Sequence, residues 1–158
     1  MQRLQDYVKK ASLIAPVRGT AVGTETYANL ANYASANIVV RANVGTSDED
    51  AVLTLVQAKD ASGTDAKALS FSRAAKVADS ATSGNAVELS GLNSSVRIGV
   101  TAGDQIWQIN VVDTDLDMAN DYTHVTVDID SSMADTVFSA EADLYHARHT
   151  GGVDKLPS

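Results

Sequence analysis

Three aspartates at alternate positions, Asp113, Asp115 and Asp117, have the spacing that most resembles a site for chemistry. An acidic DxDxD run opens the calcium loop of an EF-hand, which then requires glycine at its sixth position and glutamate at its twelfth. Those positions hold Met118 and His124 here. Aspartate and asparagine also cap turns through side-chain hydrogen bonds, and LDMAND can close a single helical turn. We therefore interpret the run as a structured turn and predict no metal site.

Two histidines, His146 and His149, form a second candidate pair with the spacing HxxH. On a strand this spacing sends the two rings to opposite faces, because strand side chains alternate. Only a local helical turn would bring the rings together, and a third ligand would have to come from a distant part of the chain. We expect two solvated histidines at an edge of the domain and no metal ion.

Residues for covalent or acid–base catalysis are present without the local patterns that would organise them. Serine and threonine are frequent, but the GxSxG elbow of a serine hydrolase is missing and the chain has no cysteine. Carboxylates are too many for one glycosidase pair to stand out. Glycine-rich phosphate loops are also missing. We predict that the protein is not an enzyme and that it uses no cofactor.

The stretch from Asp104 to Asp130 is the element around which we expect the fold to be organised. It contains two segments that alternate apolar and polar residues, separated by the aspartate-rich turn, so each segment can bury one face of a strand. The apolar residues of the two segments are Trp107, Ile109 and Val111, and then Val125, Val127 and Ile129. Similar alternation occurs from Ile38 to Val44 and from Phe138 to Leu144. About eight short strands with turns between them predict an all-β protein, a jelly-roll-like β-sandwich.

A short amphipathic helix is predicted at the N-terminus. Leu4, Tyr7, Val8 and Ala11 fall at i, i+3, i+4 and i+7, which is one stripe of a helix. A helix this short needs a surface to lie on, either its own domain or a neighbouring subunit. These four residues and Arg18 are the predicted assembly interface. We divide the chain into a helix and arm over 1–35, a β-sandwich over 36–149 and an extended tail over 150–158.

Charge and composition exclude several classes of function. The net charge is −8, and residues 1–20 carry four basic residues against one acidic, so the remainder of the chain is strongly acidic. An acidic body disfavours binding to nucleic acid, which requires clustered lysine and arginine. No run approaches the ~20 apolar residues of a membrane span, and the N-terminal residues lack the apolar core of a signal peptide. We expect no nucleic-acid partner, no membrane partner and no general secretion.

The order of these segments resembles small structural proteins of tailed bacteriophages. The likeness rests on AGDQIWQINVVDTDLDMANDYTHVTVDI, on the alanine-rich final strand ending YHARHTGG, and on the upstream segment GTAVGTETYANLANYASANIVVRANVG. The resemblance implies a head-associated virion protein, of the capsid decoration or minor capsid type, made in the host cytoplasm. It also implies that the protein binds the major capsid protein and sister subunits, in many copies on the capsid surface.

Two other functions stay open from the residues alone. A carbohydrate-binding module could use the same architecture, and it would need exposed aromatic side chains on one face, for which Tyr27, Tyr122 and Tyr145 are available. A tail-tube or connector subunit would keep the protein in the virion but place it elsewhere in the particle.

Overall fold

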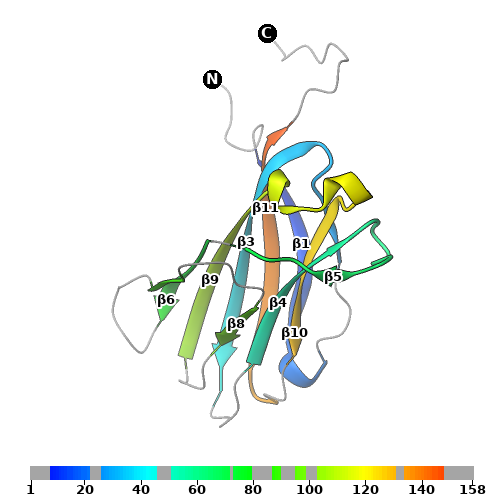
Figure 1. Ribbon diagram of the computed structural model, residues 1–158. Helices are drawn as coiled ribbons and strands as arrows, with labels where there is room; N and C mark the ends of the chain where they lie inside the picture. The colour runs from blue at the N-terminus through cyan, green and yellow to red at the C-terminus, as the bar shows by residue number, and fades with distance from the viewer. Residues whose placement is uncertain are drawn as a thin grey trace.

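The structure, a computed structural model, describes residues 8–21, 26–45, 51–71, 73–79, 87–89, 95–98, 103–130 and 134–147. These residues form two antiparallel sheets packed face to face (Figure 1). The strands are β1 (Val8–Arg18), β2 (Ala28–Asn29), β3 (Tyr33–Val44), β4 (Ala51–Ala58), β5 (Lys67–Ala68), β6 (Ala74–Asp79), β7 (Val87–Leu89), β8 (Ser95–Ile98), β9 (Gly103–Val112), β10 (His124–Asp130) and β11 (Val137–Ala147). Three short 3₁₀ turns complete the described elements: η2 (Gly19–Ala21), η3 (Asp113–Asp115) and η4 (Met118–Asn120).

The strand pairing is nested, and this nesting defines the fold. β1 pairs with β11, β2 with β10, β3 with β9 and β4 with β8, all antiparallel. These four nested pairs are folded over one another, so that β11 also pairs with β3 and β10 with β4. The resulting orders are β1-β11-β3-β9-β6-β7 in one sheet and β2-β10-β4-β5, with β8 on β4, in the other. This is the jelly-roll arrangement, so the predicted all-β jelly-roll sandwich is confirmed.

The number of strands exceeds the eight expected from the sequence because β5, β6 and β7 are additions to the eight-strand roll. All three lie between β4 and β8 in the chain. β6 pairs with the edge of β9 that faces away from β3, and β7 pairs with β6. These two strands extend the larger sheet beyond the eight strands of the jelly roll. β5 pairs with the end of β4.

The core lies between the two sheets and follows the predicted alternation. Trp107, Ile109 and Val111 on β9 are buried, and so are Val125, Val127 and Ile129 on β10. The β3 and β11 faces that meet them are also apolar and buried: Ile38, Val40, Ala42 and Val44, and Phe138, Ala140, Ala142 and Leu144. Apolar residues two apart therefore share one buried face on each long strand.

The predicted N-terminal helix is wrong wherever the structure describes it. Val8–Arg18 forms β1, which pairs with β11 over its length, from Val8 opposite Tyr145 to Arg18 opposite Val137. Leu4 and Tyr7, the other half of the predicted stripe, lie outside the described residues, as does the predicted tail over 150–158. β1 and β2 are strands of the two sheets, and the backbone N–H of Thr26 donates to Leu13 O at 2.8 Å.

Where β3 ends, at Val44 and Gly45, three segments of the chain meet around the buried residue Thr136. Thr136 is fully buried, its carbonyl accepts from the Gly19 N–H at 2.9 Å, and its Oγ1 accepts from the Gly45 N–H at 3.3 Å. A Cβ at Gly45 would stand 2.5 Å from the Cβ of Asp135. The glycine therefore lets the end of β3 approach the segment that leads into β11.

Candidate functional site

The aspartate-rich turn is a closed structural unit. It forms the two 3₁₀ turns η3 and η4 at one end of the sandwich, shown in yellow in Figure 1, which confirms the predicted structured turn. Asp115 Oδ2 accepts from the backbone N–H of Val112 at 2.9 Å. Within the described ranges the structure contains no group of three or more histidine, aspartate and glutamate side chains placed to hold a metal ion.

Asp117 joins this turn to the rest of the sandwich. Its carboxylate accepts from Lys67 Nζ at 2.7 Å and from Asn120 Nδ2 at 2.9 and 3.0 Å. Its backbone N–H donates to Oε1 of the buried Gln57 at 2.9 Å. The hydrogen bond from Lys67, followed by that from Asn120, lowers the pKa of the Asp117 carboxyl below its ordinary value. The same pairing with Asp117 raises the pKa of Lys67.

Tyr122 is held by the neighbouring loop. Its hydroxyl donates to Asp65 O at 3.0 Å, and the Lys67 ammonium lies 4.0 Å from its ring centroid. The Lys59 ammonium lies 5.6 Å from the same ring and pairs with Asp65 Oδ2 at 2.8 Å. Only 7% of Tyr122 is exposed. Its ring therefore stabilises the junction between the β4–β5 and β9–β10 loops and presents no open face on which a sugar could stack.

The other two tyrosines do not join it in one aromatic platform. Tyr145 lies on the outer side of β11 in the six-stranded sheet, and Tyr27 directly precedes β2 of the other sheet. Tyr27 packs against Gly63, where a Cβ would stand 2.9 Å from the tyrosine hydroxyl. Tyr27 and Tyr122 thus both contact the β4–β5 loop, at Gly63 and at Asp65, whereas Tyr145 lies in the other sheet, so the three candidate sugar-binding rings do not share one face.

The structure also separates the other predicted site residues. His146, the penultimate residue of β11, has a positive φ of 54°, and its ring centroid lies 6.5 Å from that of Tyr145; His149 lies outside the described residues. Val8 and Ala11 lie opposite Tyr145 and Ala142 in the β1–β11 ladder. Arg18 Nη1 donates to Ala134 O at 3.2 Å and lies 3.7 Å from Asp135 Oδ1.

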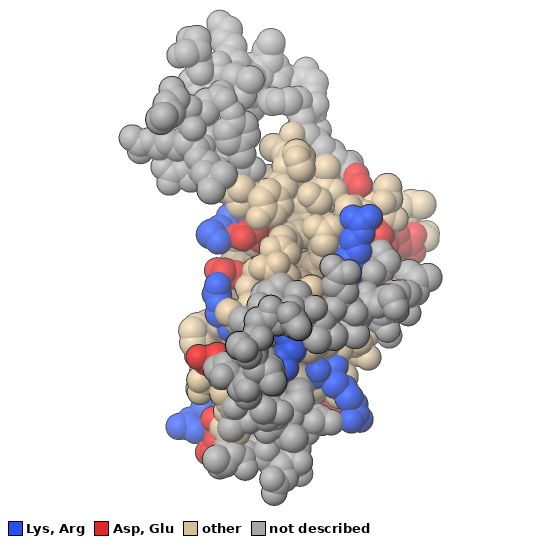
Figure 2. Space-filling model, turned by 90° about the vertical axis from the view of Figure 1, so that its left-hand side faces the viewer, with Lys and Arg blue, Asp and Glu red and all other residues tan. Residues whose placement is uncertain are grey.

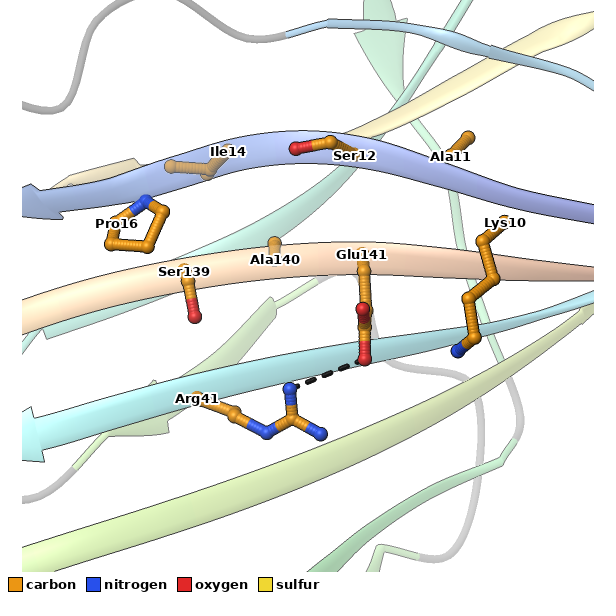
Figure 3. A pocket seen from close by; sticks show the side chains of 9 residues that line it. All are labelled: Lys10, Ala11, Ser12, Ile14, Pro16, Arg41, Ser139, Ala140 and Glu141. Atoms are coloured by element: carbon orange, nitrogen blue, oxygen red, sulfur yellow. Dashed lines mark hydrogen bonds and ion pairs between the residues drawn. The ribbon is translucent and has the colours of Figure 1, made fainter.

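The outer face of the six-stranded sheet carries a group of charged side chains that the sequence did not single out. Lys10 Nζ on β1 pairs with Asp143 Oδ1 on β11 at 2.6 Å. Arg41 Nη1 on β3 pairs with Glu141 Oε1 on β11 at 3.2 Å (Figure 3). The contact with Asp143 raises the pKa of the Lys10 ammonium. We call these four residues the ion-pair row.

Two shallow hollows flank Arg41 on this face. One, of about 340 Å³, lies toward β1 and is lined by Ser12, Ile14 and Pro16 together with part of the ion-pair row (Figure 3). The other, of about 320 Å³, lies toward β9 and is lined by Asn43, Asp104, Ile106 and Val137 among others. Val137 is 37% exposed, more than any other large hydrophobic side chain among the described residues.

The chemistry of this face suits contact with another macromolecule. The side chains lining the hollows offer both charge signs, hydroxyl groups and exposed apolar surface, and no described histidine lines either hollow to serve as a base for Ser12 or Ser139. Sequence reasoning missed the face because its pairs join residues 100 and 133 positions apart. The local indications were the polar positions of two predicted strands: Arg41 and Asn43 in the Ile38–Val44 strand, and Glu141 and Asp143 in the Phe138–Leu144 strand.

Comparisons with known proteins give little that bears on this face. No protein-family model matches the chain, and no curated protein matches it. One solved structure that is similar is the SPBc2 prophage-derived protein YomS, with 7% sequence identity, covering 88% of this chain and 93% of that chain. The TM-score is 0.37, which is too low to support an inference about function. None of the helical segments in the described ranges is long and apolar enough to cross a membrane.

Proposed function

We propose that this chain is a structural protein of a bacteriophage virion that binds the capsid surface and stabilises or decorates the head. Two observations support the proposal. The sequence resembles head-associated phage proteins in its arm, its aspartate-rich turn and its final strand. The chain also folds as a jelly roll, an architecture that viral capsid proteins share with lectins and cupins. Because a fold alone does not specify a function, the surface has to supply the argument.

The observation that carries the proposal is the outer face of the six-stranded sheet. It combines exposed ion pairs, two shallow hollows and the exposed Val137, whereas the polar groups around Tyr122 and Asp117 are already bonded to one another across two neighbouring loops. A broad face of mixed polarity is typical of protein–protein contact, where charges select the partner and apolar area contributes affinity. The partner on a phage head would be the major capsid protein or sister subunits.

In this proposal the protein performs no catalysis. Three carboxylates of the described turns, those of Asp60, Asp115 and Asp117, accept hydrogen bonds from nearby backbone or side-chain groups; Asp60 accepts them from Ser62 and Thr64. These bonds, that from the Thr64 hydroxyl first, lower the pKa of Asp60. A carboxyl group whose pKa is lowered by such hydrogen bonds stays ionised at neutral pH and caps a turn.

The test is the location and copy number of the chain in purified particles. Particles are separated into heads and tails, and the chain is quantified in each fraction by mass spectrometry against labelled standards. The proposal expects many copies per head. Enrichment in tails would favour the tail-tube or connector alternative, and absence from both fractions would refute a virion role.

Deletion of residues 1–20 is a poor test of capsid binding, because it would remove β1 and leave the edge of β11 unpaired. Loss of incorporation after such a deletion would report unfolding of the sandwich. Substitutions of exposed side chains on the outer face, such as Arg41→Glu, test binding without removing a strand.

A further inference from the structure

We propose that the outer face of the six-stranded sheet is a self-association surface, on which a second copy of this chain packs face to face. The inference rests on the proposed function, a multicopy virion protein, and deepens it by naming the surface and the partner. The observations that support it are the order of charges across the strands, the exposure of the ion pairs and the shape of the face around Arg41.

Charge sign alternates from strand to strand across this face. The charged residues on this face, in the strand order β1-β11-β3-β9, are Lys10 on β1, Glu141 and Asp143 on β11, Arg41 on β3 and Asp104 on β9. Figure 2 shows blue and red side chains interspersed along one side of the molecule, in the part of the chain that is described. A surface that carries both signs in alternating rows can be complementary to itself.

A two-fold axis between β11 and β3, parallel to these neighbouring strands, would exploit the alternation. Such an axis lays β11 of each copy over β3 of the other, since rotation about it exchanges the two positions. Arg41 of one copy then lies over Ser139 of the second, two residues along β11 from Glu141, which the long arginine side chain can reach, and the symmetry repeats the contact. One interface therefore gains two intermolecular ion pairs from a single pair of residue types.

The ion pairs within one chain are free to take part in such contacts. The Arg41 side chain is 54% exposed and that of Glu141 34%, and the ion pair between them uses only one guanidinium nitrogen, Nη1. Arginine has five N–H donors in a planar fork, so it can bond a second carboxylate without releasing the first. An exposed pair of this kind contributes little to folding, so sharing it between copies costs the fold little.

The shape of the face provides the apolar part of the contact. Arg41 lies between the two hollows, of about 340 and 320 Å³. Ile14 and Pro16 line the first, and Ile106 and Val137 line the second. A long side chain from a second copy can enter these hollows while Val137 loses its contact with water, which is the source of favourable free energy that ion pairs alone do not supply.

The experiment uses charge reversal and mixing. Arg41→Glu makes the centre of the face negative, and Glu141→Arg makes it positive. Solution mass is measured by light scattering over a range of protein concentrations for each variant and for an equimolar mixture. We expect wild type to dimerise, each variant to associate at least about tenfold more weakly because like charges meet, and the mixture to recover the dimer mass.

Two further variants keep the test specific. Asp128→Arg reverses an exposed charge on the outer side of β10, in the other sheet, and is expected to leave the mass of wild type unchanged. Val137→Asp introduces a charge into the apolar part of the face and is expected to weaken association. Far-UV circular dichroism and thermal melts confirm that every variant is folded before its mass is interpreted.

The inference is overturned if wild type is monomeric at every concentration, or if the equimolar mixture stays monomeric. It is also overturned if Asp128→Arg weakens association as much as Arg41→Glu. These results are separable from the fate of the proposed function. A monomeric protein that is abundant in purified heads refutes self-association alone, and a dimeric protein absent from particles refutes the virion role alone.

Discussion

Leu13→Ala tests whether β1 is an integral strand of the sandwich. Leu13 is 1% exposed and belongs to the core, although it sits in an edge strand at a shift in register between Ser12 and Ile14. Its backbone carbonyl accepts from Thr26 N, and the substitution leaves that hydrogen bond in place. The variant therefore isolates the contribution of the buried side chain.

The size of the effect follows from the atoms removed. Leucine to alanine removes three carbons, about 2.4 kcal/mol at roughly 0.8 kcal/mol for each buried group. A residual cavity of about 50 Å³ would add about 1 kcal/mol. The free energy of unfolding should fall by about 3–4 kcal/mol, which corresponds to a decrease in Tm of about 6–16 °C for a domain of this size.

The assay is urea unfolding followed by circular dichroism, with thermal melts as a second measure. Ser12→Ala, at an exposed position of the same strand, is the matched control and should change stability by less than about 0.5 kcal/mol. If Leu13→Ala also cost less than about 0.5 kcal/mol, β1 would not be packed as described, and an N-terminal arm that is dispensable for folding would be the better account.

Three other substitutions test separate parts of the structure. Gly45→Ala should lower the free energy of unfolding by about 1–3 kcal/mol through overpacking against Asp135, and unchanged urea unfolding would contradict the close approach. Trp107→Ala should cost about 3–5 kcal/mol in the same assay, because Trp107 is 6% exposed in the core; a loss under about 1 kcal/mol would contradict that packing. For Asp117, whose pKa is lowered by Lys67, the stability contributed is present above the unfolded pKa and lost as pH falls through the folded pKa. The decrease in Tm caused by Asp117→Asn should therefore be largest near neutral pH and vanish toward about pH 2; a decrease independent of pH would contradict the pairing.

The long strands could be predicted because apolar residues at alternate positions give each of them one buried face. Trp107 to Val111, Val125 to Ile129 and Phe138 to Leu144 alternate without interruption, and the structure buries the predicted side of each. The nested pairing that makes the sandwich a jelly roll joins strands far apart in the chain, which alternation alone does not specify.

β1 escaped prediction because its alternation is broken. Register shifts occur between Ser12 and Ile14 and between Ile14 and Val17, so Leu13 and Ile14 are both buried although they are adjacent. The spacing of Val8 and Ala11 then fitted a helical stripe as well as a strand. What decides between them is pairing with β11, whose residues lie 119 to 137 positions later in the chain, and no local pattern contains that information.

The candidate surface was missed for a related reason. Arg41 and Glu141 read as ordinary outward residues of two separate strands, and only the β3–β11 pairing places them together. The contacts that hold Tyr122 likewise come from Lys67 and Asp65, which lie in a different loop. Because the Tyr122 ring is buried at this junction, it is not one of the exposed aromatic residues that the carbohydrate-binding alternative requires.

The measurement that tests the virion role most directly is binding of the purified protein to phage heads assembled without it. Sedimented heads are assayed for bound protein over a range of concentrations, with Arg41→Glu and the control Asp128→Arg measured in parallel. The account predicts saturable binding of wild type and of Asp128→Arg, and reduced binding of Arg41→Glu. Failure of the folded wild-type protein to bind at any concentration would contradict it.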